Sequence, residues 1–134
     1  TEAQLQWLEK TLTEATEDWI VVVGHHPIYA YTDKSESERT DMQKKVDTIL
    51  RKHNVDMYIC GHIHNYQHIH RPDSKIDYVV NTSGSLTRTP QKIDGTVFCN
   101  DSPGFSVLTA DKNNLRLNML DKDGKTVHIV NRTK

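Results

Sequence analysis

The sequence predicts an α/β fold in which a βαβ unit with parallel strands precedes an antiparallel strand meander. Two short apolar runs, IVVVG at 20–24 and MYICG at 57–61, are typical of strands buried on both faces of a sheet. The segment between them carries apolar residues at helical spacing, whereas the last third of the chain alternates apolar and polar residues. With 134 residues, the chain is long enough for one small domain.

Two helices are predicted. The first covers residues 1–15, where Thr1 and Gln4 fit a capping box and leucines recur at helical spacing. The second covers residues 38–54 and follows a polar segment, 31–41, that we expect to be a loop. Its apolar face consists of Met42, Val46, Ile49 and Leu50. These two helices are too few to cover both faces of a buried sheet, so we infer that a partner layer is missing.

The second half of the chain predicts antiparallel strands. YQHIHR and IDYVVNT flank PDSK, which is typical of a hairpin turn. Residues 84–104 contain glycine, proline and aspartate and are predicted to form a long loop. Three alternating strands follow, GFSVLTAD, NLRLNMLD and TVHIVNR, joined through KNN and KDG.

Composition excludes few functions. The 17 Lys and Arg nearly balance the 18 Asp and Glu, so charge gives no reason to expect nucleic acid or membrane binding. The chain starts at Thr1 without a signal peptide, and we expect its true N-terminus to lie elsewhere. Two cysteines are too few for a disulfide framework, and Cys60, at the end of an apolar run, is predicted to be a buried thiol.

A glycine followed by a histidine ends each buried strand, in VGHHP and in CGHIH. The carboxyl ends of parallel strands meet at one edge of a sheet, where ligands bind in open α/β folds. We expect each glycine to let the backbone turn sharply and place an imidazole over that edge. His25, His62 and His64 then converge as ligands of a transition metal. A single histidine after a strand is more often solvated or hydrogen-bonded, and the repetition on consecutive strands favours the metal site.

The remaining histidines are predicted to lie outside the ligand set. His26 is a candidate catalytic residue, as a proton donor or as a group behind the ligands. His68 and His70 alternate along a predicted strand, and one polar strand face accounts for both. His53 at a helix end and His128 in the last strand are predicted to be structural or exposed.

GHHPIY at 24–29 and GHIHNYQ at 61–67 resemble the last two motifs of the calcineurin-like metallophosphoesterases. The closer resemblance is to purple acid phosphatases of the tartrate-resistant type, through QLQWLEKTL, VDMYICGHIHN, YVVNTSGS and GFSVLTAD. The likeness covers nearly the whole chain. It implies that residues 1–134 are the C-terminal part of a single metallophosphoesterase domain, half of an α/β/β/α sandwich whose N-terminal half is absent.

In that family two metal ions, about 3.5–4 Å apart, polarise a phosphate ester and activate water. The resemblance implies that His25 and His62 bind one metal, which is divalent in purple phosphatases, and that His64 binds the other, a ferric ion; Fe would pair with Fe, Zn or Mn. It also implies an acid phosphatase acting on phosphomonoesters and export to the periplasm or the cell exterior. The alternatives are a phosphodiesterase or nucleotidase of the same superfamily, and a non-catalytic metal-binding module.

The family's other ligands, in Asp-x-His, Gly-Asp and Gly-Asn-His motifs, are not found in this chain. Asp94 and Asp101 lie outside any such motif, and Arg88 and Lys92 are loop cations that could approach a phosphate. Three imidazoles cannot hold two multiply charged metals, which need a bridging carboxylate to offset their repulsion. We therefore expect these residues alone to bind at most one Zn²⁺ or similar ion weakly and to be inactive or nearly so. An exposed face where the N-terminal half packs would favour a dimer.

Overall fold

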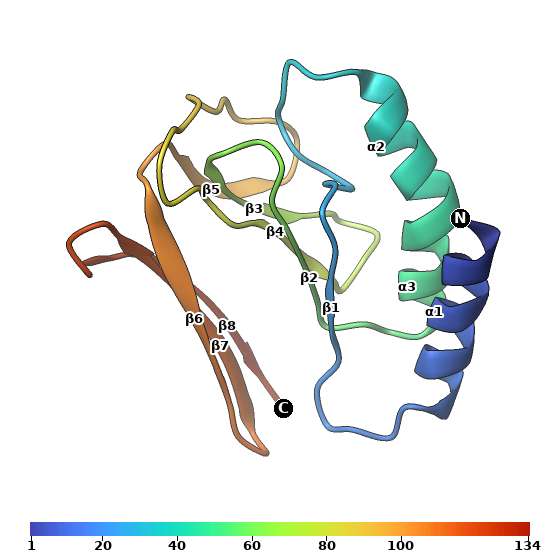
Figure 1. The fold of residues 1–134 in the computed structure, drawn as a ribbon. Helices are drawn as coiled ribbons and strands as arrows, with labels where there is room; N and C mark the ends of the chain where they lie inside the picture. The colour runs from blue at the N-terminus through green and yellow to red at the C-terminus, as the bar shows by residue number, and fades with distance from the viewer.

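The computed structural model describes residues 1–134 and has three layers, namely helices, a five-stranded sheet and a three-stranded sheet (Figure 1). None of its helices has the length and apolar character needed to cross a membrane. The elements are α1 (Glu2–Glu14), β1 (Val21–Val23), α2 (Glu36–Met42), a π-helical stretch (Gln43–Asp47), α3 (Thr48–Lys52), β2 (Met57–Cys60), β3 (Tyr66–His70), β4 (Asp77–Val80), β5 (Thr96–Asn100), β6 (Gly104–Ala110), β7 (Asn114–Asp121) and β8 (Thr126–Thr133).

The predicted βαβ unit is present. β1 and β2 pair in parallel, with Val22 opposite Tyr58, and the continuous helical segment from α2 to α3 connects them. The five-stranded sheet has the order β1-β2-β4-β3-β5, in which β3 and β4 form the predicted antiparallel hairpin. The predicted meander is also confirmed, because β6, β7 and β8 pair antiparallel as a separate three-stranded sheet.

Two sequence predictions fail at element boundaries. The predicted loop at 84–104 contains β5, whose β-forming residues pair with β3 and extend the sheet by one strand. The predicted loop at 31–41 is helical from Glu36 onward, since the helix starts after Ser35 with two acidic residues in its first turn. Negative charge near a helix N-terminus is favourable, which explains why this polar segment joins the helix.

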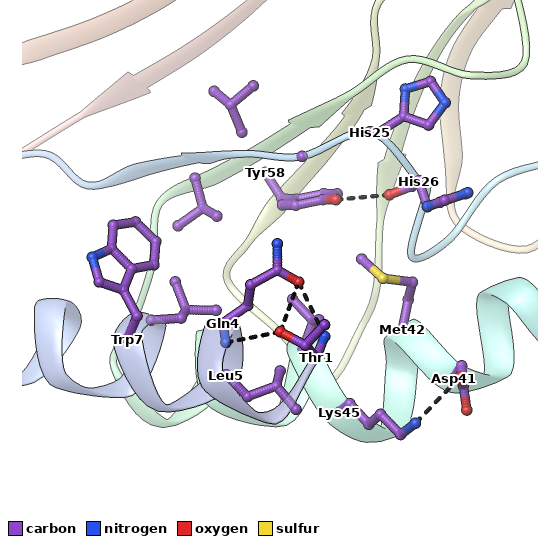
Figure 2. Close-up of a pocket in the computed structure, with 15 residues that line it drawn as sticks. Thr1, Gln4, Leu5, Trp7, His25, His26, Asp41, Met42, Lys45 and Tyr58 are labelled. Atoms are coloured by element: carbon purple, nitrogen blue, oxygen red, sulfur yellow. Dashed lines mark hydrogen bonds and ion pairs between the residues drawn. The ribbon is translucent and has the colours of Figure 1, made fainter.

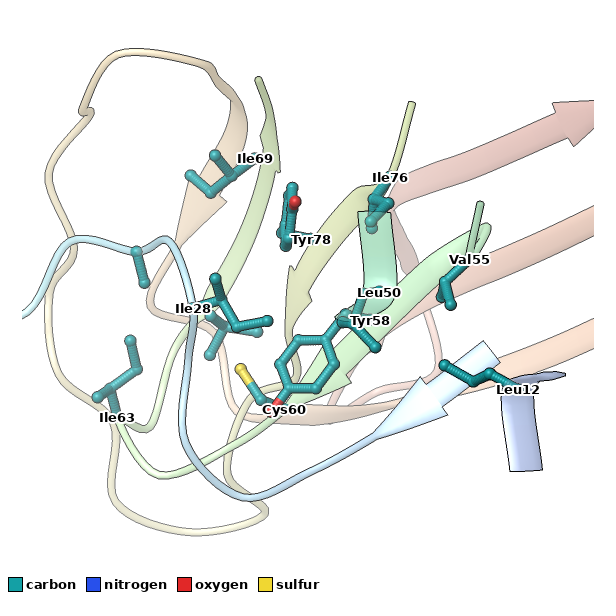
Figure 3. Packing of buried hydrophobic residues seen from close by; sticks show 12 residues of the cluster. Leu12, Ile28, Leu50, Val55, Tyr58, Cys60, Ile63, Ile69, Ile76 and Tyr78 are labelled. Atoms are coloured by element: carbon teal, nitrogen blue, oxygen red, sulfur yellow. The ribbon is translucent and has the colours of Figure 1, made fainter. Parts of the chain in front are cut away.

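Two apolar clusters lie on opposite faces of the five-stranded sheet. Successive residues of β2 alternate between them. Tyr58 packs toward the helices, in the cluster that Figure 3 shows, and Met57 packs toward the three-stranded sheet. Elements of this chain therefore pack on both faces of the sheet, although Val23 at the end of the edge strand β1 stays 73% exposed. The three-stranded sheet supplies the covering layer, with Leu115, Leu117 and Met119 of β7 fully buried against it.

A polar network also joins the two sheets. His68 of β3 is buried; it lies 2.7 Å from an Asp77 carboxylate oxygen through Nε2 and 3.0 Å from His128 Nε2 through Nδ1. Arg132 of β8 donates to Asp77 at 3.1 Å and also contacts Asp56. The predicted polar face of β3 is thus real, but at His68 it faces the second sheet and not solvent.

Candidate metal centre

The two Gly-His turns lie side by side because β1 and β2 are adjacent and end at the same edge of the sheet. Backbone hydrogen bonds continue the pairing past the strand ends: Gly24 N donates to Ile59 O at 3.0 Å, and Gly61 N donates to His25 O at 3.1 Å. This explains how the sequence brings His25 next to a turn that lies 37 residues further along the chain.

The glycines do not supply the sharp backbone turn that the sequence predicted. The left-handed conformations fall on His62, with φ of 75°, and on His64, with φ of 58°. Gly24 and Gly61 are not among the residues with positive φ. A non-glycine residue in this region costs roughly 1–3 kcal/mol, and such residues are concentrated at functional sites. The strain therefore lies on the candidate ligands themselves.

Gly24 has no side chain, and this leaves room for the Tyr58 hydroxyl group. A Cβ built on it would lie 2.3 Å from the Tyr58 hydroxyl oxygen, which is closer than real Cβ atoms approach. That hydroxyl donates to the carbonyl oxygen of His26 at 2.7 Å, and burial raises the pKa of Tyr58, so it stays a neutral donor (Figure 2). Tyr58 thus fixes the turn that carries His25 and His26.

Three imidazoles meet at this edge. The nearest ring nitrogens of His25, His26 and His62 lie within 4.8 Å of one another, and their ring centroids are 4.6–5.0 Å apart. Nε2 of His25 faces Nδ1 of His62 at 3.0 Å. The structure thus brings together two of the three predicted ligands, His25 and His62, and adds the predicted catalytic candidate, His26.

Glu38, which the sequence did not single out, contacts the far side of the His62 ring. Its Oε2 lies 3.3 Å from His62 Nε2. Burial lowers the pKa of His62, and the hydrogen bond to Glu38 opposes that shift. No pattern in the sequence pointed to Glu38, because the contact depends on where α2 lies relative to the sheet.

His64, the third predicted ligand, does not join this group of imidazoles. Its Nδ1 lies 3.1 Å from the carbonyl oxygen of Leu86, to which it donates, and Nε2 is left available. The backbone of Arg88 donates to His64 O at 2.9 Å, and the Asn65 amide donates to Arg88 O at 3.1 Å. The loop after β4 therefore orients His64 separately from the other histidines.

The other candidates lie away from the imidazole group. His70 is exposed on β3, while His53 ends α3 and lies 2.9 Å from a Glu9 carboxylate oxygen. The Asp101 side chain accepts from Thr89, and the backbone carbonyl of Asp94 accepts from Arg71. None of these belongs to the three-residue group that could hold an ion.

The donor set fits one divalent transition metal. Neutral imidazole suits Zn²⁺ and similar ions, and the facing nitrogens of His25 and His62 provide two such donors. It does not fit two ions by itself, because no carboxylate belongs to the group of His25, His26 and His62. A bridging carboxylate is what offsets the repulsion of two adjacent cations.

Residues 1–66 match the model of the calcineurin-like phosphoesterase family, and this segment contains all three imidazoles of the group. Over this segment the chain is similar to the calcineurin-like phosphoesterases. Among curated relatives, tartrate-resistant acid phosphatase type 5 of Oryctolagus cuniculus is 33% identical over 83 residues, covering 62% of this chain and 25% of that protein. Purple acid phosphatase 4 of Arabidopsis thaliana is 28% identical over 128 residues, covering 90% of this chain and 36% of the relative.

Solved structures share the fold of this chain. A structure described as GAP50, the anchor in the inner membrane complex of Plasmodium, has a TM-score of 0.86 at 23% identity and covers 98% of this chain and 42% of its own. The purple acid phosphatase PPD1 from yellow lupin seeds has a TM-score of 0.75 at 18% identity, covering 97% of this chain and 28% of its own. The chain thus spans less than half the length of these relatives.

Proposed function

We propose that the imidazole group is part of the active site of a metal-dependent phosphoric ester hydrolase, an acid phosphatase acting on phosphomonoesters. The observation that carries this proposal is the pair of ring nitrogens, His25 Nε2 and His62 Nδ1, that face each other at 3.0 Å over the carboxyl edge of two parallel strands. The family match over residues 1–66 and the acid phosphatase relatives support the reaction class.

Each residue has a proposed role. His25 and His62 would hold one metal ion, and His64 would offer Nε2 to a second. A pair of metal ions, when bound, supplies positive charge for the phosphate oxygens and lowers the pKa of water. His26, whose ring lies beside His62 and is exposed, would donate a proton to the leaving oxygen of the ester.

The remaining ligands would come from a polypeptide segment outside these 134 residues. The supporting observation is an open groove beside the histidines, with a cavity volume of about 500 Å³, between the helices and the edge strand β1 (Figure 2). Trp7 of α1 and Val23 of β1 line it and are 66% and 73% exposed. A strand edge and apolar side chains left open to this extent are suited to packing by further chain.

The test uses two proteins. The 134-residue chain is expected not to hydrolyse p-nitrophenyl phosphate, and turnover that is lost on substitution of the metal-site histidines would contradict this. The longer chain encoded by the reading frame around these residues is expected to hydrolyse p-nitrophenyl phosphate in preference to bis-p-nitrophenyl phosphate. His25→Ala and His62→Ala should abolish that activity, whereas the exposed His70→Ala should not. Preference for the diester would favour a phosphodiesterase.

A second candidate is a non-catalytic domain that uses the same fold for anchoring. It is favoured by the TM-score of 0.86 to a structure described as an anchor, which exceeds the 0.75 to the lupin phosphatase. A longer chain that folds and binds Zn²⁺ but hydrolyses neither substrate would support this candidate. Activity that is lost with His62→Ala would exclude it.

A further inference from the structure

We propose that Glu38 is a positioning residue that holds the His62 imidazole with its proton on Nε2 and its Nδ1 lone pair free for a divalent metal ion. The inference rests on the proposed metal site and names the residue that prepares one of its ligands. It starts from one contact: Glu38 Oε2 lies 3.3 Å from His62 Nε2, while Nδ1 of the same ring faces His25.

The ordinary role of a glutamate at this position is helix capping. Ser35 and Glu38 have the spacing of a capping box, in which the glutamate bonds back to the N-cap backbone. The structure shows a different arrangement: Ser35 is the N-cap residue of α2 but makes no side-chain cap bond, and its hydroxyl pairs with Ser37 at 2.7 Å. The Glu38 carboxylate points to His62 instead. Capping therefore does not account for it.

The contact selects a tautomer. A neutral imidazole carries one N–H, and an ionised carboxylate can only accept a hydrogen bond. The Glu38 contact is satisfied only when His62 carries its proton on Nε2, which leaves the Nδ1 lone pair facing His25. Without a metal, His25 Nε2–H donates to that lone pair; a cation needs the same lone pair. Histidine ligands commonly give their second N–H to a carboxylate, which orients the ring and raises its basicity.

His64, the second histidine of the same turn, carries its proton on the other ring nitrogen, Nδ1. His64 donates Nδ1–H to the carbonyl oxygen of Leu86, so its Nε2 carries the lone pair. Both histidines also have strained, left-handed backbone conformations. Each ring has its own hydrogen-bond partner, which is Glu38 for His62 and the Leu86 carbonyl oxygen for His64. His64 provides an internal reference, because its partner is backbone and does not change when Glu38 is substituted.

The size of the effect follows from exposure. The Glu38 side chain is 35% exposed and that of His62 is 16% exposed, so solvent screens part of the interaction. Loss of such a partner typically weakens metal binding by about 10- to 100-fold, and screening places Glu38 near the lower end, at roughly 10-fold.

The experiment reads tautomers and metal affinity in the same proteins. Long-range ¹H–¹⁵N correlation spectra of the metal-free chain at about pH 8, where imidazole is neutral, report which ring nitrogen of each histidine carries the proton. Zn²⁺ affinity is measured by calorimetry. The variants are Glu38→Ala, Glu38→Gln, and the control Glu36→Gln, which removes the same charge from an exposed position in the first turn of α2.

We expect His62 to carry its proton on Nε2 in the unsubstituted chain, to become a tautomer mixture in Glu38→Ala, and to lose Zn²⁺ affinity about 10-fold there. Glu38→Gln should keep the tautomer, because the amide oxygen still accepts, with a smaller loss of affinity. Glu36→Gln should change neither, and His64 should keep Nε2 unprotonated throughout.

An unchanged His62 tautomer in Glu38→Ala would overturn the inference, as would an equal loss of Zn²⁺ affinity in Glu36→Gln, which would indicate a general charge effect. A different result would contradict the proposed metal site without contradicting the role of Glu38. If the unsubstituted chain binds no Zn²⁺ while the His62 tautomer still depends on Glu38, the positioning role stands and the metal site does not. Far-ultraviolet circular dichroism of Glu38→Ala should match that of the unsubstituted chain, since α2 uses no Glu38 cap.

Discussion

Adding one methyl group at Gly24 tests how the site is built. A Cβ there would lie 2.3 Å from the Tyr58 hydroxyl oxygen and 3.1 Å from its ring carbon Cζ. Tyr58 must move, and the movement breaks its hydrogen bond to His26 O. Overpacking costs about 1–3 kcal/mol and a lost buried hydrogen bond about 1 kcal/mol, so Gly24→Ala should lower the free energy of unfolding by roughly 2–4 kcal/mol.

The partner substitution makes the prediction specific. Tyr58→Phe alone loses only the hydrogen bond to His26 and should cost about 1–1.5 kcal/mol. In the double variant the closest clash has gone, while the 3.1 Å approach to the ring remains. The combined loss should therefore be smaller than the sum of the single losses by at least about 1 kcal/mol.

Urea unfolding monitored by circular dichroism measures these free energies. Gly61→Ala is the matched control: it is the glycine of the other Gly-His turn, no atom lies within 4 Å of its added Cβ, and its φ is not positive. It should change stability by less than about 0.5 kcal/mol. Additive losses at Gly24 and Tyr58, or an equal loss at Gly61, would refute the reasoning that Tyr58 positions the turn.

Three further predictions concern the scaffold. Burial and His68 hold the pKa of His128 below its usual 6.5. The unfolded chain therefore binds more protons than the folded chain near pH 6, and the free energy of unfolding should fall as pH drops through 6.5. In urea unfolding at a series of pH values, His128→Gln should flatten this dependence, and an unchanged dependence would contradict the prediction. Gly95→Ala should cost at least about 2 kcal/mol, because φ is 92° and the Cβ would lie 2.3 Å from His70 O, whereas Gly84→Ala, with no close neighbour, should be nearly neutral in thermal unfolding. Leu117→Ala, in the cluster between the sheets, should cost about 2–5 kcal/mol by urea unfolding, and a loss below about 1 kcal/mol would contradict that packing.

Strand periodicity predicted the elements that carry the site. The apolar runs around β1 and β2 indicated two parallel strands with their Gly-His ends together, and the structure confirms that arrangement. The short strand β5 was missed because glycine, proline and aspartate around it outweigh its five residues in any local pattern. Periodicity shows that a strand is buried but not which element covers it, so the packing of the three-stranded sheet on one face could not be predicted.

Within the site, residue types were predictable and their partners were not. The Gly-His repeats identified His25 and His62, but the predicted role of the glycines as sharp turns was wrong. Gly24 makes room for Tyr58, a contact between different strands that no local pattern contains. Glu38 could not be identified for the same reason, because its spacing from Ser35 is that of a helix cap and its actual contact depends on tertiary packing.

Zn²⁺ calorimetry on the 134-residue chain and its histidine variants tests the central claim most directly. We predict that one Zn²⁺ ion binds, that His25→Ala and His62→Ala each abolish the binding, and that His70→Ala, exposed on β3, leaves it unchanged. Absence of binding, or binding that survives in His62→Ala, would contradict the claim that these facing imidazoles form a metal centre.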